Sequence, residues 1–289
     1  MLFDSKSPQS LIAKALHYMN NGENELAITY LEKALEYNPN SARVINYLSD
    51  FYANYVPNTK KYLEYALKGI QLDIASNDST TASYIYLHVS NAFIQSGFIK
   101  ESEMYINTSL EYNSENLFSE YVKAYILYAK NRDLAKTKEL LIKAYNKDLT
   151  RLDILQEIGK ICYYMRDYKS AHTYYNKFIE MKEAQHLDIF RGEDAKIAVV
   201  LSKIGLKEES ERYFKKYKDY AENDESIYKH LSLSMYYSYQ GDTNKALEHM
   251  KLFSQQDNYN FWTTIFFKDR SFGGYYDRNT RIPATFANH

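Results

Sequence analysis

The histidines and the cysteine are the residues of this sequence best suited to metal binding or nucleophilic catalysis, and their spacing supports neither. The seven histidines form no H-x3-H or H-E-x2-H pair, and the single cysteine, Cys162, lies near no histidine that would complete a mixed ligand set. Cys162 falls on the apolar face of a predicted helix, where a thiol usually packs as a small hydrophobic group. The sequence therefore predicts no metal site, no internal disulfide and no cysteine nucleophile.

Glycine-rich loops and paired carboxylates are the other patterns that could carry catalysis. The sequence has no G-x4-G-K-[ST] loop, no G-x-S-x-G elbow and no G-x-G-x2-G turn, and Gly273-Gly274 alone is too weak a signal for a phosphate loop. Glu208 and Glu209 lie on a predicted helix surface, for which a solvated face is the ordinary explanation. We expect no enzymatic activity and no cofactor.

Composition restricts the class of partner. The 289 residues include 36 Lys plus Arg against 37 Asp plus Glu, so no global field favours nucleic acid or an anionic membrane. No stretch reaches the roughly 18 apolar residues of a membrane span, and the amino terminus lacks the pattern of a signal peptide. We expect a cytoplasmic protein that binds no membrane. The 31 tyrosines have two explanations, packing between helices or an aromatic binding surface.

The clearest repeated pattern runs from Ile158 to Phe178. It places a small residue in each of two helices, Gly159 and Ala171, between bulky residues such as Tyr175. Small residues let two helices approach closely while bulky neighbours fill the grooves, so the pattern predicts a helix-turn-helix pair. Turn glycines recur in the same register, and these are Gly22, Gly97, Gly205 and Gly241.

These spacings resemble the tetratricopeptide repeat (TPR), a pair of antiparallel helices about 34 residues long. The resemblance implies an all-α fold, a right-handed superhelical solenoid of about seven repeats within residues 1–269. The predicted copies are residues 8–41, 42–76, 83–116, 118–150, 152–185, 191–224 and 227–258. A one-residue insertion near Val56-Pro57 predicts local irregularity, and Tyr125 replaces the small residue of the fourth copy. We expect a closing helix at 259–268 over the last pair and an irregular, poorly ordered tail at 270–289.

A narrower resemblance links residues 163–267 to the carboxyl-terminal repeat region of multidomain bacterial regulators. It rests on Tyr168-Lys169-Ser170-Ala171, Lys203-Ile204-Gly205 and the segment 255–259. The resemblance implies a sensory or assembly role. The sequence departs from that group after Lys268-Asp269 and carries none of its upstream modules, so DNA binding or nucleotide cyclisation is not implied.

In TPR proteins the first helix of each repeat lines the inner, concave wall. Reading the corresponding positions gives the residues that we call the inner-face residues: Asn46, Asp50, Asn54, Tyr84, Asn91, Gln95, Lys130, Gln156, Lys160, Tyr163, Tyr164, Tyr228, Met235 and Tyr239. Amides that both donate and accept, beside rigid tyrosine rings, suit an extended or helical peptide. The alternative is that these positions are polar merely because they face water. We expect Asn91→Ala to weaken the binding of a peptide partner while leaving the stability of the protein nearly unchanged.

Chaperone-tail-binding TPR proteins grip a terminal carboxylate with Lys, Asn and Arg in the first repeats. Ile12 and Leu16 stand at the corresponding positions, so that clamp is absent. With Met19 they form an apolar amino-terminal surface suited to a hydrophobic partner or to self-association.

We expect a scaffold that binds a partner protein or peptide. A helical-repeat nucleic-acid-binding protein is the second hypothesis, which the net charge of -1 and Asp50 disfavour. A small-molecule sensor is the third.

Overall fold

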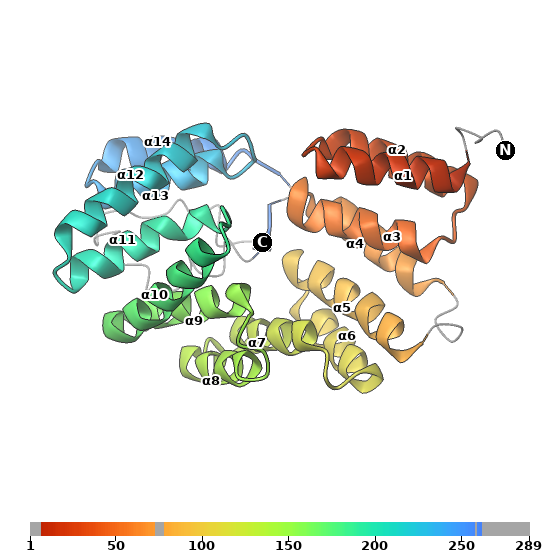
Figure 1. Ribbon diagram of the computed structural model, residues 1–289, viewed down its shortest axis with the longest axis horizontal. Helices are drawn as coiled ribbons and strands as arrows, with labels where there is room; N and C mark the ends of the chain where they lie inside the picture. The colour runs from red at the N-terminus through yellow and green to blue at the C-terminus, as the bar shows by residue number, and fades with distance from the viewer. Residues whose placement is uncertain (1–6, 73–77, 258, 262–289) are drawn as a thin grey trace. The chain divides into compact units, whose positions relative to one another are not determined.

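The computed structural model describes residues 7–72, 78–257 and 259–261, and the regular elements among them are all helices (Figure 1). The chain divides into two compact units at the boundary between Lys130 and Asn131, with residues 259–261 belonging to unit 1. Unit 1 contains α1 (Pro8–Asn20), α2 (Asn24–Tyr37), α3 (Ala42–Asp50), η1 (Phe51–Tyr55), α4 (Thr59–Ile70), α5 (Ser79–Gln95), α6 (Ile99–Tyr112) and most of α7 (Leu117–Asn131). Unit 2 contains α8 (Leu134–Tyr145), α9 (Leu152–Tyr164), α10 (Tyr168–Ala184), η3 (Arg191–Glu193), α11 (Asp194–Lys203), α12 (Lys207–Asn223), α13 (Lys229–Tyr239) and α14 (Thr243–Phe253).

Short polar residues determine where many of these helices begin. In each such cap the side-chain oxygen accepts a hydrogen bond from the backbone N–H three residues later, which satisfies a donor that the first turn leaves without a partner. The capping residues are Ser7, Asn58, Asp78, Asp133, Asp167 and Asp242. In α1 the cap precedes Pro8, whose fixed φ suits the first helical position.

Left-handed residues end the first helix of most pairs. Gly22, Gly97, Gly205 and Gly241 have φ values of 76°, 90°, 93° and 77°. Arginine occupies the same conformation in two further turns, with φ of 57° at Arg132 and 60° at Arg166. A side chain in this conformation is strained, so these two turns form because packing on both sides imposes the geometry.

Small residues bring the helices of a pair into contact. Ser90 of α5 and Ser102 of α6 each donate a hydrogen bond of 2.8 Å to the other's backbone carbonyl. The same spacing of twelve residues gives Ser210 Oγ donating to the Ala198 carbonyl and Ser234 Oγ donating to the Ala246 carbonyl, both at 2.8 Å. These hydrogen bonds replace those that the hydroxyls would make to water if the helices were apart.

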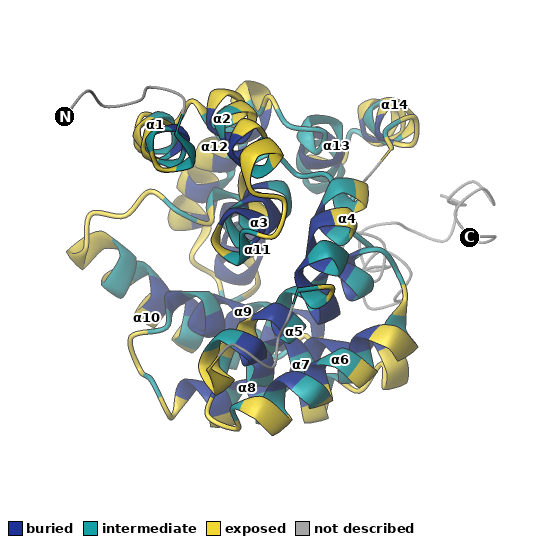
Figure 2. Cartoon of the chain, turned by 90° about the vertical axis from the view of Figure 1, so that its right-hand side faces the viewer, coloured by how far each residue is buried: buried dark blue, intermediate teal, exposed yellow. Residues whose placement is uncertain are grey.

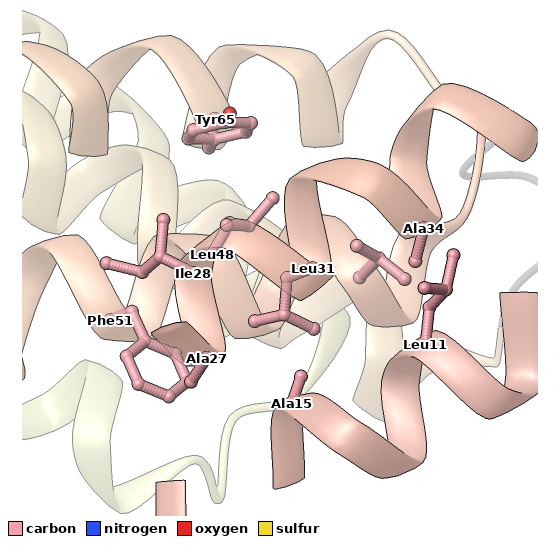
Figure 3. Close-up of a cluster of buried hydrophobic side chains, with 10 residues drawn as sticks. Leu11, Ala15, Ala27, Ile28, Leu31, Ala34, Leu48, Phe51 and Tyr65 are labelled. Carbon is pink, nitrogen blue, oxygen red and sulfur yellow. The ribbon is translucent and has the colours of Figure 1, made fainter. Parts of the chain in front are cut away.

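The amino-terminal core is made by one apolar stripe from each of several helices. Leu11 and Ala15 of α1 face Ala34 and Leu31 of α2, and Leu48 of α3 belongs to the same cluster (Figure 3). Burying an aliphatic side chain of this size stabilises the fold by about 1.5–3 kcal/mol. Across the described residues, buried positions follow the helix faces that meet neighbouring helices, and exposed positions lie on the outer helix faces and in turns (Figure 2).

The predicted irregularity in the second copy is a π-helix, Phe51–Tyr55, which continues α3. The Val56 N–H donates 2.9 Å to the Phe51 carbonyl, a step of five residues. One extra residue in a helix produces this geometry, and such segments often mark functional sites.

The prediction of an all-α helical-repeat fold is confirmed. Of the predicted closing helix, only residues 259–261 are described, and there the Phe261 ring lies against Gly97 of the α5–α6 turn, so that a methyl group at Gly97 would meet it at 3.5 Å. Residues 262–268 of that helix and the predicted tail at 270–289 lie outside the described residues. No described helix is both long enough and apolar enough to cross a membrane.

Candidate interaction surface

Unit 1 carries seven inner-face residues on the first helices of its pairs. Asn46 and Asp50 lie on α3, Asn54 on η1, Tyr84, Asn91 and Gln95 on α5, and Lys130 on α7. Asn54, Tyr84 and Lys130 are exposed, whereas Asn46, Asp50 and Asn91 are partly exposed. Gln95 is buried, so it faces the packed interior.

A chain of hydrogen-bonding groups links three of these helices. The Asn91 amide nitrogen donates 3.2 Å to the hydroxyl oxygen of Tyr62, a fully buried residue of α4. The Tyr62 hydroxyl lies 3.3 Å from Nδ1 of His88, and Nε2 of His88 lies 3.7 Å from Oδ1 of Asp50. Since the tyrosine oxygen already accepts from Asn91, its own proton is available for Nδ1, which leaves the imidazole proton on Nε2, facing Asp50.

The electrostatics of this chain favour a neutral imidazole. Burial lowers the pKa of His88, and the Asp50 carboxylate opposes this shift without reversing it. Burial also holds the pKa of the Tyr62 hydroxyl well above its ordinary value, and the amide of Asn91 acts in the opposite direction. At neutral pH the imidazole and the phenol in this series of hydrogen-bonding groups are therefore neutral, and Asp50 is its one carboxyl group.

Sequence reasoning found Asp50 and Asn91 and missed His88 and Tyr62. His88 stands one turn before Asn91 on the same helix, at a repeat position that the inner-face selection omits. Tyr62 lies on a second helix of a pair, for which no inward position was considered. A histidine one helical turn from a selected amide was the available signal.

The bond to Tyr62 changes the expected role of Asn91. Removing that amide would leave the tyrosine oxygen with one partner fewer in a buried place, at a cost of about 1 kcal/mol. The expectation that Asn91→Ala leaves stability nearly unchanged is therefore revised: we predict a loss of that size in urea unfolding, against a change within about 0.5 kcal/mol for Asn54→Ala.

Two exposed inner-face residues of unit 1 are engaged with neighbours. The Lys130 ammonium pairs with Oε2 of Glu103 on α6 at 2.8 Å. The Tyr84 and Phe118 rings lie 6.3 Å apart between centroids, and both are exposed. Such contacts on open surface are individually weak, so a partner could replace them at little cost.

The inner-face residues of unit 2 are mostly engaged by neighbouring side chains of the same unit. The hydroxyls of Tyr163 on α9 and Tyr239 on α13 lie 3.4 Å apart, although the residues are 76 positions apart in sequence. The Tyr217 hydroxyl lies 3.8 Å from the Met235 sulfur, and the Tyr228 ring packs against Phe253. Tyr164 is buried.

Gln156 and Lys160 belong to a buried ionic cluster. Both donate at 2.5 Å to Oε1 of Glu157, while Lys196 and the Tyr175 hydroxyl donate at 2.9 Å to the two oxygens of Glu193. Oε1 of Gln156 and Oε2 of Glu157 are buried without a hydrogen-bond partner.

The pKa values of the two glutamates in the cluster are shifted in opposite directions. Burial raises the pKa of Glu157 against the pull of Lys160. Burial also acts to raise the pKa of Glu193, but Lys196, Lys160 and Tyr175 outweigh it, so that this pKa lies below its usual value. The cluster holds two ammonium groups against two carboxyl groups, which balances charge inside the fold.

The remaining groups with reactive chemistry are packed inside. Cys162 is buried, and burial raises the pKa of its thiol while Lys138 acts to lower it. Within the described ranges, no group of three or more His, Cys, Asp and Glu side chains is placed to hold a metal ion. The inner-face residues of unit 1 offer binding groups, namely amides, a tyrosine ring and the half-exposed carboxylate of Asp50.

Comparisons with known proteins agree with this architecture. Tetratricopeptide repeat models match residues 8–41 and 152–185. No curated protein matches the sequence.

Among solved structures, the apo form of RapI is similar with a TM-score of 0.61 at 14% identity, covering 86% of this chain and 96% of that one. PilW, described as a widely conserved type IV pilus biogenesis factor, gives a TM-score of 0.57 at 14% identity over 75% of this chain and 95% of its own. A monomeric mutant of IFIT1 with Gppp-AAAA gives 0.55 at 16% identity over 86% of this chain and 71% of its own. At these identities the similarity concerns the fold alone. Two segments of the chain, residues 8–41 and 152–185, thus match the tetratricopeptide repeat, within a helical-repeat fold.

Proposed function

We propose that this protein is a non-catalytic scaffold that binds a segment of a partner protein through the inner-face residues of unit 1. Tetratricopeptide repeats in general support protein–protein interaction, and the similarity of the fold to other repeat proteins is consistent with that role. The resemblance of residues 163–267 to bacterial regulators supports a sensory or assembly role in the bacterial cytoplasm.

The observation that carries the proposal is the difference in exposure between the two sets of inner-face residues. In unit 1 the amides of Asn46 and Asn54 and the carboxylate of Asp50 reach solvent. In unit 2 the equivalent residues are largely used by the fold, in the Glu157 ion pair and the Tyr163–Tyr239 contact. An approaching peptide backbone therefore meets more unused hydrogen-bonding capacity in unit 1.

The sign of the exposed charge argues against nucleic acid. A nucleic-acid track places Lys and Arg along a strand of phosphates, and Asp50 would repel one. The cation among the inner-face residues of unit 1, Lys130, is already paired with Glu103.

Affinity capture from a bacterial lysate tests the proposal. The bait is the full chain, and the test variant is Asn46→Ala/Asn54→Ala/Tyr84→Ala, which truncates inner-face side chains with some exposure. The matched control is Glu36→Ala/Lys100→Ala/Glu111→Ala, which truncates three exposed residues on the second helices α2 and α6. Thermal melting of each variant verifies that it is folded.

A protein retained by the wild type and by the control, and lost by the test variant, is the expected result. Equal recovery by all three baits would place the interaction elsewhere on the molecule. Recovery of RNA in place of protein, removable by ribonuclease, would establish the nucleic-acid-binding alternative.

A further inference from the structure

We propose that Asp50 receives a basic side chain, lysine or arginine, from the bound partner segment, and that His88 makes this recognition sensitive to pH. The inference rests on the proposed function, since it names the chemistry of the partner at the same surface.

The hydrogen-bond chain behind Asp50 runs in one direction. Asn91 donates to Tyr62 at 3.2 Å, Tyr62 faces Nδ1 of His88 at 3.3 Å, and the remaining imidazole proton on Nε2 faces Asp50. Every donor in the chain therefore points toward the carboxylate. Aligned dipoles of this kind point their positive ends at the Asp50 carboxyl group.

Asp50 remains accessible while its supporting groups are covered. Its side chain is 50% exposed, against 18% for His88. The 3.7 Å separation between Oδ1 and Nε2 is longer than a good hydrogen bond, so the carboxylate retains capacity to accept from another donor. Guanidinium and ammonium groups are donors only, and a carboxylate is their preferred acceptor.

The surroundings of Asp50 add amide acceptors and donors. Asn46 lies one turn before it on the same face of α3, and Asn54 follows it on η1. A peptide running along this face would place its backbone against the amides and a basic side chain against the carboxylate.

Protonation of His88 would oppose binding. Asp50 from α3 and Tyr62 from α4 are the groups that face the imidazole, and Asp50 is the charged one. A protonated His88 would place a fixed positive charge 3.7 Å from Oδ1, where it would neutralise the carboxylate and repel an incoming cation. Affinity for a basic peptide should therefore fall as the solution is acidified.

The test uses random twelve-residue peptide pools with blocked termini, each with one fixed central residue and no other charged residue. The central residues are arginine, lysine, citrulline and acetyl-lysine, the last two being uncharged matches of the first two. Binding to the full chain is measured by fluorescence polarisation at pH 7.5 and pH 5.5. We expect the charged pools to bind about tenfold more tightly than their uncharged matches at pH 7.5, a typical value for one charge-assisted contact.

Two variants test whether Asp50 causes the preference for a positive charge and whether His88 causes its pH dependence. Asp50→Asn keeps the size of this exposed side chain and should remove the preference for charged pools. His88→Gln should keep that preference and remove its weakening at pH 5.5, and Glu36→Gln, an exposed carboxylate on α2, should behave as the wild type.

The outcomes separate the two proposals. Binding of all pools with no preference for a positive charge, or a preference that survives Asp50→Asn, overturns the recognition by Asp50 and leaves the scaffold proposal standing. Failure of the wild type to bind any pool at either pH counts against peptide recognition as a whole and overturns both.

Discussion

Gly159 lies where α9 meets α10, and its missing side chain determines how closely these helices approach. A methyl group at Gly159 would stand 2.9 Å from a ring carbon of Tyr175, which is fully buried and donates its hydroxyl to Glu193. The ring has little freedom to move, because its hydroxyl is fixed in the ionic cluster. The absence of a methyl group at this position therefore lets α9 and α10 pack at their observed distance.

The residue-scale prediction is that Gly159→Ala destabilises the protein by about 1–3 kcal/mol, the usual cost of overpacking a core. Gly69 on α4 is the matched control, because a methyl group there would meet Ile85 and Ile45 at 3.6 and 3.8 Å, ordinary contact distances. Gly69→Ala should raise the free energy of unfolding by up to about 1 kcal/mol, since alanine restricts the unfolded chain. Urea unfolding measures both, and a neutral Gly159→Ala would show that Tyr175 can move.

At the scale of elements, one turn and one helix pair have features that affect stability. Arg166 follows α9 in a left-handed conformation that glycine occupies in four of the other turns. The last pair, α13 and α14, is joined by His230 and His249, whose Nδ1 atoms lie 3.0 Å apart. Their ring centroids are 5.3 Å apart, so the two nitrogens point at each other, and one can donate a hydrogen bond to the other.

Arg166→Gly should stabilise the protein by about 1 kcal/mol, because glycine adopts this φ of 60° without the steric penalty that a side chain carries. The reverse change, Gly205→Arg at φ of 93°, should destabilise it. Thermal melting of the two variants measures whether the first gains stability and the second loses it. A loss of stability in Arg166→Gly would mean that contacts of the arginine side chain exceed the backbone strain.

The histidine contributions to the free energy of unfolding should fall as the pH falls from about 7 to 5, whereas Asp194, whose pKa burial raises to about 6, contributes in the opposite direction. Burial lowers the pKa of His249, His230 lowers it further, and Glu248 acts in the opposite direction. A histidine whose folded pKa lies below its unfolded value of about 6.5 binds fewer protons when folded, so acid favours unfolding. His88 contributes in the same direction.

Urea midpoints at pH 7.5 and pH 5.5 measure this dependence. On acidification from pH 7.5 to pH 5.5, the midpoint of His249→Gln should shift toward higher urea relative to that of the wild type, because the variant lacks a titrating group whose pKa the fold lowers. An unchanged difference in His249→Gln would show that the paired histidines do not contribute to acid sensitivity.

At the scale of the whole molecule, each unit is stabilised by contacts between sequential helices. In such repeat proteins stability is close to a sum over repeats and the interfaces between neighbours. We therefore predict that Gly159→Leu, which overpacks α9 against α10, raises amide hydrogen exchange in α9–α12 much more than in α1–α5. Mass spectrometry of peptic fragments measures the difference. A uniform rise across both units would indicate that the chain unfolds as one cooperative body.

The sequence by itself determined the helical-repeat fold and the turns that punctuate it. Small residues twelve positions apart and glycines in matching register are local features, and local contacts carry most of the information in a repeat fold. Ser90 with Ser102, and Gly22 in its left-handed turn, follow directly from that pattern. The insertion near Val56 likewise indicated the irregular segment that the structure shows as η1.

Tertiary structure alone decided which polar residues remain available. The sequence treats Asn54 and Gln156 alike, as amides at inward positions, yet Asn54 is exposed and Gln156 is buried beside Glu157. Their fates differ because availability depends on what neighbouring repeats place opposite, and those residues are distant in sequence. For the same reason His88 became part of the candidate site only when α3, α4 and α5 brought Asp50, Tyr62 and Asn91 around it.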